Sequence, residues 1–242
     1  MKTLRPFLSY YGSKWRAAPL YPVPRYSTII EPFAGAAGYS IRYHLADVIL
    51  IDKNPIICEV WRYLINADPA RILSLPDIGE ETIDDPRHAW LSQAEKWLIG
   101  FWLNSATASP RKQPGAWARN RPGVAAYWGK RRRQILADQV GQIRHWRVID
   151  GDYWDAPDIE ATWYVDPPYQ NMGKHYPCEV PDFTALGDWC RTRKGQTIVC
   201  ENMGADWLPF RFLADIKAAH RPGKTGKSAE AIWTNDTGES PC

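Results

Sequence analysis

The sequence predicts an α/β fold in which a parallel sheet is interrupted by a helical, basic insertion. Strand-like apolar runs alternate with helical patterns in the first and last parts of the chain, an arrangement typical of parallel sheets. Between residues 69 and 146, helical periods replace the strands. With 242 residues and 45% hydrophobic content, the chain can bury a substantial core, which argues against a disordered protein.

The first part of the chain contains two predicted strands. Residues 27–33 form an apolar run that ends at the small-residue loop AGAAG, and a helical stretch is expected at 39–45. Residues 47–52 form a second apolar run that ends at Asp52, and the pattern over 56–68 predicts a helix. This order is that of a βαβ unit.

The middle of the chain combines a helical pattern with positive charge. Apolar residues at helical spacing predict a core-facing stripe, made of Trp90, Leu91, Ala94, Trp97, Leu98, Phe101 and Trp102. A proline-containing loop at 109–123 precedes a second predicted helix at 124–143. Residues 105–150 hold ten Lys or Arg against two Asp, a net charge of +8, and the whole chain carries only +3. Such a segment is suited to a polyanion, although a solvated helical face has the same composition.

The last part returns to strands. Four candidates are WRVIDGDYW, ATWYVDPPY, QTIVCEN and AEAIWTN, and a helix is predicted over 183–193. The chain therefore divides into the first part of a sheet domain (1–68), a helical insertion (69–145) and the second part of the sheet domain (146–242). We expect a protein of the cytoplasm, because no signal or membrane-spanning segment is apparent. The five cysteines are scattered, which favours reduced thiols and no metal site.

Two local patterns predict a binding site at the carboxyl ends of the strands. Neither Pro167 nor Pro168 can donate to a sheet ladder, so the strand at 161–165 must end by Asp166, which leaves a carboxylate and backbone carbonyls beside the ring of Tyr169. The loop at 33–38 and Asp52 predict an adenosine-containing cofactor, because an acid at the end of the second strand can accept ribose hydroxyls. The loop departs from G-x-G-x-x-G, which argues against a dinucleotide.

Together these segments resemble a known family. YYGSK near the amino terminus, EPFAGAAG after the first strand, Asp52, and DPPY after a later strand are similar to the Dam-type adenine-N6 DNA methyltransferases. The resemblance covers residues 7–68 and 146–242, and the insertion matches only in its placement and basic character. It implies a Rossmann-like methyltransferase sheet, S-adenosylmethionine as the cofactor, and an inserted target-recognition domain that contacts duplex DNA.

The resemblance also implies roles for individual residues. Phe33 and Gly35 would line the cofactor pocket, Asp52 would hold the ribose, and Asp152 would contact the adenine of the cofactor. The full implied cofactor set is Tyr10, Gly12, Lys14, Phe33, Ala34, Gly35, Asp52, Asp152 and Asp166. The implied catalytic set is Asp166, Pro167, Pro168 and Tyr169. One departure is that Ala37 stands where the family has its second loop glycine.

The chemistry of adenine accounts for the catalytic set. The exocyclic nitrogen of adenine is a poor nucleophile, because its lone pair is delocalised into the ring. Asp166 and the carbonyl of Pro167 can accept its two amino hydrogens and turn the lone pair toward the methyl donor. Tyr169 can stack on the base once the base has left the duplex. We expect a monomer that requires no metal.

Eight basic residues of the insertion are the predicted nucleic-acid contacts: Arg111, Lys112, Arg119, Arg121, Lys130, Arg131, Arg132 and Arg133. Two other functions remain open at this point. An RNA adenine-N6 methyltransferase would use the same base chemistry, and a non-catalytic nucleic-acid-binding module could keep the same fold. A protein-glutamine methyltransferase fits less well, because that chemistry is associated with Asn at the position of Asp166 and gives no reason for a basic insertion.

Overall fold

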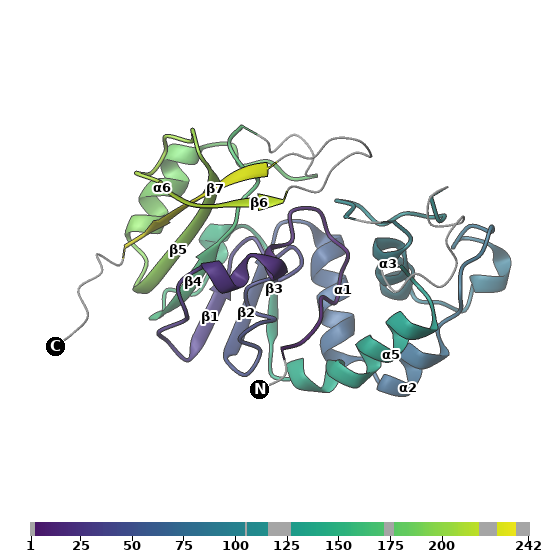
Figure 1. Cartoon of the computed structure of the whole chain (residues 1–242). Coiled ribbons are helices and arrows are strands. Elements are labelled where there is room, and N and C mark those ends of the chain that lie inside the picture. The colour runs from purple at the N-terminus through teal and green to yellow at the C-terminus, as the bar shows by residue number, and fades with distance from the viewer. Residues whose placement is uncertain (1–2, 105, 116–126, 172–176, 218–226, 236–242) are drawn as a thin grey trace.

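The structure is a computed structural model of the chain. It describes residues 3–104, 106–115, 127–171, 177–217 and 227–235, and the coloured parts of Figure 1 show this region. Within it, no helix is long and apolar enough to cross a bilayer. The four cysteines that the structure describes, Cys58, Cys178, Cys190 and Cys200, are free thiols.

A seven-stranded sheet forms the centre of the fold (Figure 1). Its spatial order is β3-β2-β1-β4-β5-β7-β6. The strands are β1 (Thr28–Glu31), β2 (Asp47–Asp52), β3 (Arg147–Asp150), β4 (Ala161–Val165), β5 (Gly195–Asn202), β6 (Arg211–Lys217) and β7 (Lys227–Thr234). Every pairing from β3 to β5 is parallel, and β7 runs antiparallel to both of its neighbours. The predicted parallel sheet is confirmed, and β6 was not predicted.

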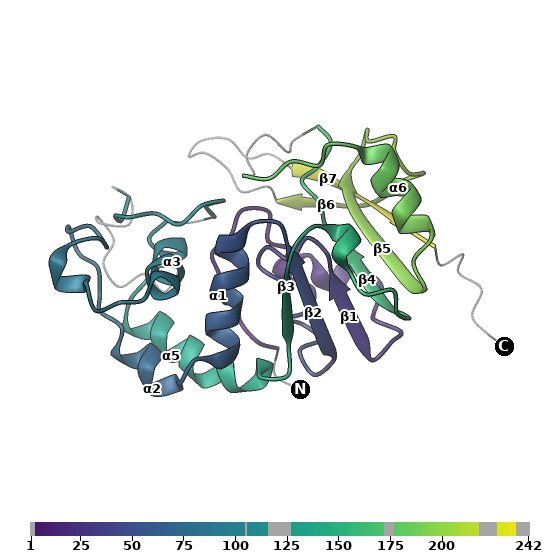
Figure 2. The same cartoon turned by 180° about the vertical axis from the view of Figure 1, so that it is seen from behind.

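The two faces of the sheet bury alternate residues of each strand, as the two-residue period of a strand requires. Val48 and Leu50 belong to one apolar cluster, which includes residues of α1 (Pro55–Asn66). Ile49 and Ile51 belong to a second cluster, which includes residues of α6 (Phe183–Arg191). Figure 2 shows the sheet between these two helices. Both helices were predicted, and α1 begins at Pro55 because Asn54 caps it by accepting from Ile56 N at 3.1 Å.

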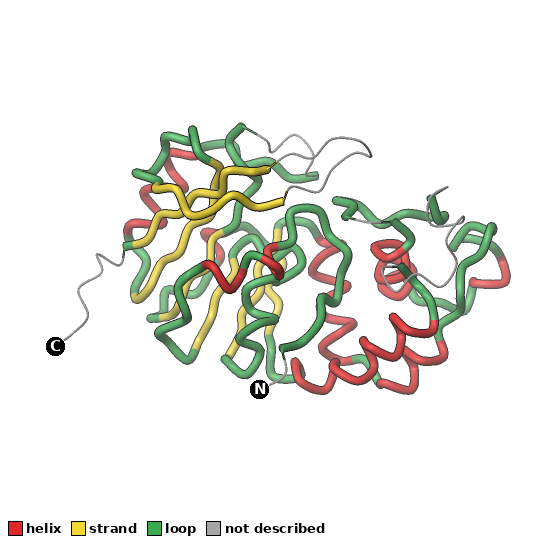
Figure 3. Tube along the Cα trace, viewed as in Figure 1, coloured by secondary structure: helices red, strands yellow, loops and turns green. Residues whose placement is uncertain are grey.

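The residues of the insertion form helices that gather beside α1 (Figure 3). They are α2 (Pro69–Ser74), α3 (Gln93–Trp102), α5 (Lys130–Gln139) and the short 3-10 helices η3 (Pro86–His88) and η4 (Val140–Ile143). Leu98, Phe101 and Trp102 of the predicted stripe are buried in the same cluster as Val48, whereas Trp90 is half exposed. The described part of the insertion adds no strand to the seven-stranded sheet. The insertion therefore shares a core with the sheet.

Two helix predictions need correction. Residues 39–45 form successive turns instead of a helix, and Ser40 N donates to the buried carboxylate of Glu31 at 2.7 Å. The helix predicted over 124–143 starts only at Lys130, and residues 124–126 lie outside the described residues. Three further 3-10 helices, η1 (Lys14–Arg16), η2 (Ala18–Leu20) and η5 (Tyr153–Asp155), complete the fold.

Candidate functional site

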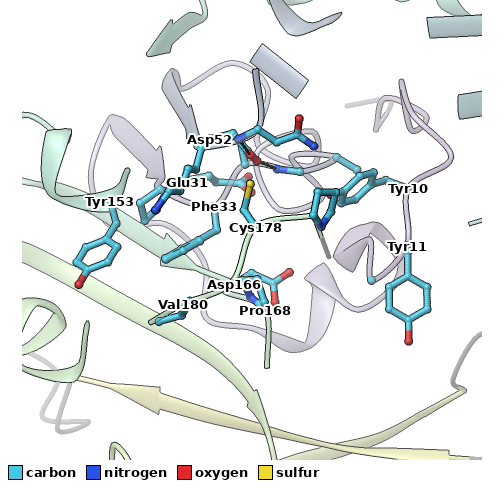
Figure 4. A pocket seen from close by; sticks show the side chains of 18 of the residues that line it. Tyr10, Tyr11, Glu31, Phe33, Asp52, Tyr153, Asp166, Pro168, Cys178 and Val180 are labelled. Carbon is cyan, nitrogen blue, oxygen red and sulfur yellow. Dashed lines mark hydrogen bonds between the residues drawn. The ribbon is translucent and has the colours of Figure 1, made fainter. Parts of the chain in front are cut away.

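A cavity lies at the carboxyl ends of β1, β2 and β4 (Figure 4). All nine residues of the predicted cofactor set line this cavity, although they come from separate segments of the chain. Of the predicted catalytic set, Asp166 and Pro168 line the cavity, and Pro167 and Tyr169 are their neighbours in the chain after β4. The strand order reverses between β1 and β4, and such a reversal is where open α/β sheets bind ligands.

The loop after β1 depends on glycine for its geometry. Gly35 has a φ of +43°, and a Cβ at this position would lie 3.2 Å from the Tyr10 ring. A Cβ on Gly38 would lie 2.6 Å from Trp15 N and 2.9 Å from Lys14 N. These glycines therefore allow the amino-terminal segment that carries Lys14 to pack directly on the loop. Ala37 adopts a φ of +49°, so this alanine takes a conformation that favours glycine.

Asp52 is oriented by two backbone amides. Gly35 N donates to one carboxylate oxygen at 2.9 Å, and Asn54 N donates to the other at 2.8 Å. Burial raises the pKa of Asp52 to about 6, and the two amide hydrogen bonds oppose this rise. Each oxygen keeps a further lone pair, so the carboxylate can accept hydroxyl groups from a ligand in the cavity.

Asp152 is held at the edge of the cavity. It caps η5 by accepting from Tyr153 N at 2.7 Å, and its second oxygen accepts from Lys53 Nζ at 2.8 Å. The Lys53 ammonium is half exposed and lies 6.0 Å from the centre of the Trp154 ring. Phe33 packs beside Tyr153 with a ring separation of 5.8 Å, which provides an apolar wall between β1 and η5.

Asp166 forms a largely buried ion pair with Lys14. Lys14 Nζ lies 2.8 Å from one Asp166 oxygen and 3.1 Å from the other, and it also donates to Gly12 O at 3.3 Å. Burial raises the pKa of Asp166, whereas the charge and the hydrogen bond of Lys14 lower it. The pair joins the amino-terminal segment to the end of β4. The strand ends at Val165, as the two prolines predicted.

Tyr169 makes contacts that the sequence did not predict. Its hydroxyl donates to Glu230 on β7, and the Lys14 ammonium lies 4.6 Å from the centre of its ring. The next residue, Gln170, donates its backbone N–H to Glu201 on β5 at 3.0 Å. Two buried glutamates on adjacent strands therefore hold the segment that follows the prolines.

The predicted nucleic-acid contacts fall into three groups. Lys130, Arg131, Arg111 and Lys112 are exposed, and Lys112 pairs with Asp84 at 2.8 Å. Arg119 and Arg121 lie outside the described residues. Arg132 is buried and Arg133 is half-buried.

Arg132 is buried, and its guanidinium lies 3.6 Å from the centre of the Trp102 ring, while Arg133 pairs with Asp77. Burial lowers the pKa of Arg132 to about 10. The prediction that Arg132 contacts phosphate is therefore wrong for this structure, because successive residues of a helix point in different directions and one of the four must face the core.

The cavity also contains residues that the sequence did not single out. These are Tyr11, Ser13, Glu31, Tyr153, Tyr164 and the segment 177–181 among others. Glu31 stood next to the predicted loop, so its place at the end of β1 could have identified it; the segment 177–181 carried no such signal. Within the described residues, no group of three or more His, Cys, Asp or Glu side chains is arranged to hold a metal ion. No protein-family model matches the chain, and no curated protein matches it.

Proposed function

We propose that this chain transfers a methyl group from S-adenosylmethionine to the exocyclic nitrogen of an adenine that has been flipped out of duplex DNA. One observation carries the proposal. A single cavity at the reversal point of the sheet brings together the loop after β1, Asp52, Asp166 and Pro168. These are the parts on which the sequence resemblance rests.

The residues that line the cavity fit the proposed cofactor. Asp52 offers carboxylate oxygens for ribose hydroxyls, the ring of Phe33 offers an apolar surface, and Asp152 offers an acceptor at the rim. S-adenosylmethionine would supply an electrophilic methyl group on a sulfonium. The N–C bond forms as the sulfur–methyl bond breaks, a thioether is released, and the methylated nitrogen then loses one proton to water.

Asp166 and the Pro167 carbonyl are the proposed acceptors for the two amino hydrogens of adenine. Accepting them turns the nitrogen lone pair out of the base plane and stabilises the positive charge that develops during transfer. Lys14 fixes the Asp166 carboxylate from one side at 2.8 Å. Because Asp166 and Lys14 are both largely buried, this arrangement exists before the base arrives.

Duplex DNA is the proposed substrate, because the sequence resemblance is to enzymes that act on DNA. The amino group lies inside the base stack, so a cavity of this kind requires a base that has left the duplex. Lys130, Arg131 and Arg111 are exposed cations on the inserted part of the chain, which suits a phosphate backbone. Folded RNA presents similar phosphates and is therefore the competitor in the test.

The test combines binding and competition. S-adenosylmethionine should raise the melting temperature of the protein, and titration calorimetry should show a binding site that Asp52→Ala weakens by about 10-fold or more. Equal amounts of duplex DNA and folded RNA are then offered together with a labelled methyl donor. The proposal predicts label in the DNA. Label in the RNA alone would favour the RNA enzyme, and cofactor-free binding to DNA with no label would favour the binding module.

A further inference from the structure

Glu230 is a buried carboxylate beside the proposed catalytic segment. It lies on β7 and is only 3% exposed. The Tyr21 hydroxyl donates to it at 2.8 Å, the Tyr169 hydroxyl donates to the same oxygen, and Lys14 Nζ lies 3.8 Å away. A carboxylate buried at this depth requires such partners, because an unpaired buried charge is strongly unfavourable.

We infer that Glu230 is a positioning residue for methyl transfer. It orients Tyr169, and it serves the Lys14 ammonium as a second carboxylate partner besides Asp166. The inference rests on the function proposed above. Glu230 would touch neither the methyl donor nor the base. It would act through the two side chains that border them.

The backbone of β7 gives Glu230 a rigid support. β7 lies between two strands, and Glu230 is in register with Asn202 of β5 and with Ala214 of β6. Side chains on such paired strands are held more precisely than side chains on loops. Tyr169 belongs to a loop, so its hydroxyl bond to Glu230 ties the catalytic segment to the sheet.

Charge is the second part of the argument. Lys14 is a single cation between two carboxylates, at 2.8 Å from Asp166 and 3.8 Å from Glu230. Without Glu230, its repulsion of the Asp166 charge would be lost while the attraction of Lys14 stayed, and Asp166 would become a weaker acceptor for the adenine amino group. In agreement with this, the Glu230 charge raises the pKa of Asp166 and the Lys14 charge lowers it.

Glu230→Gln isolates the charge, because the amide oxygen can still accept a hydrogen bond. Asp166 must be ionised to accept amino hydrogens, so activity falls as the pH drops through its pKa. Removing the Glu230 charge lowers the pKa of Asp166 and moves this acid limb to lower pH. The other titratable groups that act on Asp166 or feel its charge stay in place: Lys14, Tyr21, Glu31, Tyr164, Tyr169, Cys200 and Glu201.

Two tyrosines provide matched controls. Tyr169→Phe and Tyr21→Phe each remove one hydroxyl bond to Glu230 and keep the ring. Only Tyr169 belongs to the catalytic segment. We therefore expect Tyr169→Phe to lower kcat by about 10-fold and Tyr21→Phe to change kcat by less than about 2-fold.

The experiment measures the carboxyl carbon of Asp166 by NMR titration, with the signal assigned from its loss in Asp166→Asn, together with kcat and KM. In Glu230→Gln, the Asp166 signal should titrate at lower pH, kcat should fall by about 10-fold at neutral pH, and cofactor affinity should stay within about 3-fold. An unchanged Asp166 titration, or equal kcat losses in the two tyrosine variants, would overturn the inference. If the wild-type protein methylates neither DNA nor RNA, the proposed function fails, while the titration still decides whether Glu230 controls the charge at Asp166.

Discussion

Lys14 and Asp166 are 152 positions apart in the chain, and their side chains form an ion pair at 2.8 Å. Lys14 reaches this place because the amino-terminal segment packs on the glycines of the loop after β1. Asp166 reaches it because two prolines end β4 at Val165. The pair thus connects the two sequence motifs in one cavity, and each of the following predictions disturbs one part of this arrangement.

Replacing Asp166 with Asn should abolish transfer and spare cofactor binding. The amide keeps the size of the carboxylate but loses its charge, and one of its two polar groups donates instead of accepting. We expect methyl transfer to fall by about 10²–10⁴-fold, with cofactor affinity within about 3-fold of wild type. Single-turnover assays and calorimetry on the same preparation measure both quantities. Wild-type turnover by the Asp166→Asn variant would refute the role of this carboxylate.

Gly38→Ala should displace the segment that carries Lys14. The new Cβ would lie 2.6 Å from Trp15 N, which is backbone and cannot rotate away. Such overpacking costs about 1–3 kcal/mol of unfolding free energy, and it should also weaken cofactor binding. Gly141→Ala is the matched control, because nothing lies within 4 Å of its Cβ position and its cost should stay below about 0.5 kcal/mol. Urea unfolding of both variants makes the comparison; equal stabilities would contradict the packing argument.

The free energy of unfolding should depend on pH through Glu31. Burial raises the pKa of Glu31 from 4.5 to about 8, so the folded state holds its proton between these values while the unfolded state releases it. The contribution of Glu31 to the free energy of unfolding is fully present below pH 4.5. It is lost as the pH rises toward 8, by roughly 3–5 kcal/mol in total. Glu31→Gln can keep the hydrogen bond from Ser40 N and does not titrate.

Urea unfolding of the wild type and of Glu31→Gln at pH 5 and pH 8 tests this dependence. The variant should be the more stable protein at pH 8 and should lose less stability between the two pH values. In both proteins, Asp52 adds a smaller loss of unfolding free energy as the pH rises, since burial raises its pKa to about 6. Parallel curves for the two proteins would show that Glu31 is ionised in the folded state.

Neighbouring arginines of α5 should separate folding from DNA binding. Arg131 is exposed, whereas Arg132 is buried against Trp102 at 3.6 Å. Arg132→Ala should lower the free energy of unfolding by about 1–3 kcal/mol. Arg131→Ala should leave it within about 0.5 kcal/mol and lower the salt dependence of DNA binding by about one counter-ion. Thermal unfolding measures the stability of both variants, and DNA titrations at several salt concentrations measure their DNA binding. If Arg131→Ala lowered stability and left the salt dependence unchanged, this face of α5 would be excluded from the DNA contact.

Local sequence patterns predicted the elements that carry the site. The runs before Glu31, Asp52 and Asp166 form parallel strands, because a short apolar run that ends at polar or proline residues is typical of a buried strand. The resemblance supplied the residues that meet in the cavity. It could not supply their partners, since Glu230 contacts Lys14, Tyr21 and Tyr169 only after folding.

Tertiary contacts also explain the errors. Residues 39–45 have a helical pattern, but Ser40 N is bonded to the Glu31 carboxylate, and the segment folds as turns. β6 was missed because its sequence, RFLADIK, alternates weakly, and the strand is stabilised by its pairing with β7. Arg132 was assigned to DNA because composition does not reveal which residue of a basic run faces the core.

The most direct test is to incubate the wild-type protein and Asp166→Asn with unmethylated duplex DNA and S-adenosylmethionine that carries a labelled methyl group. The DNA is then digested to nucleosides, and the labelled nucleoside is identified. The proposed function predicts N6-methyladenine from the wild type and at least about 100-fold less from the variant. Label on another base, or no label from wild-type protein that binds the cofactor, would contradict it.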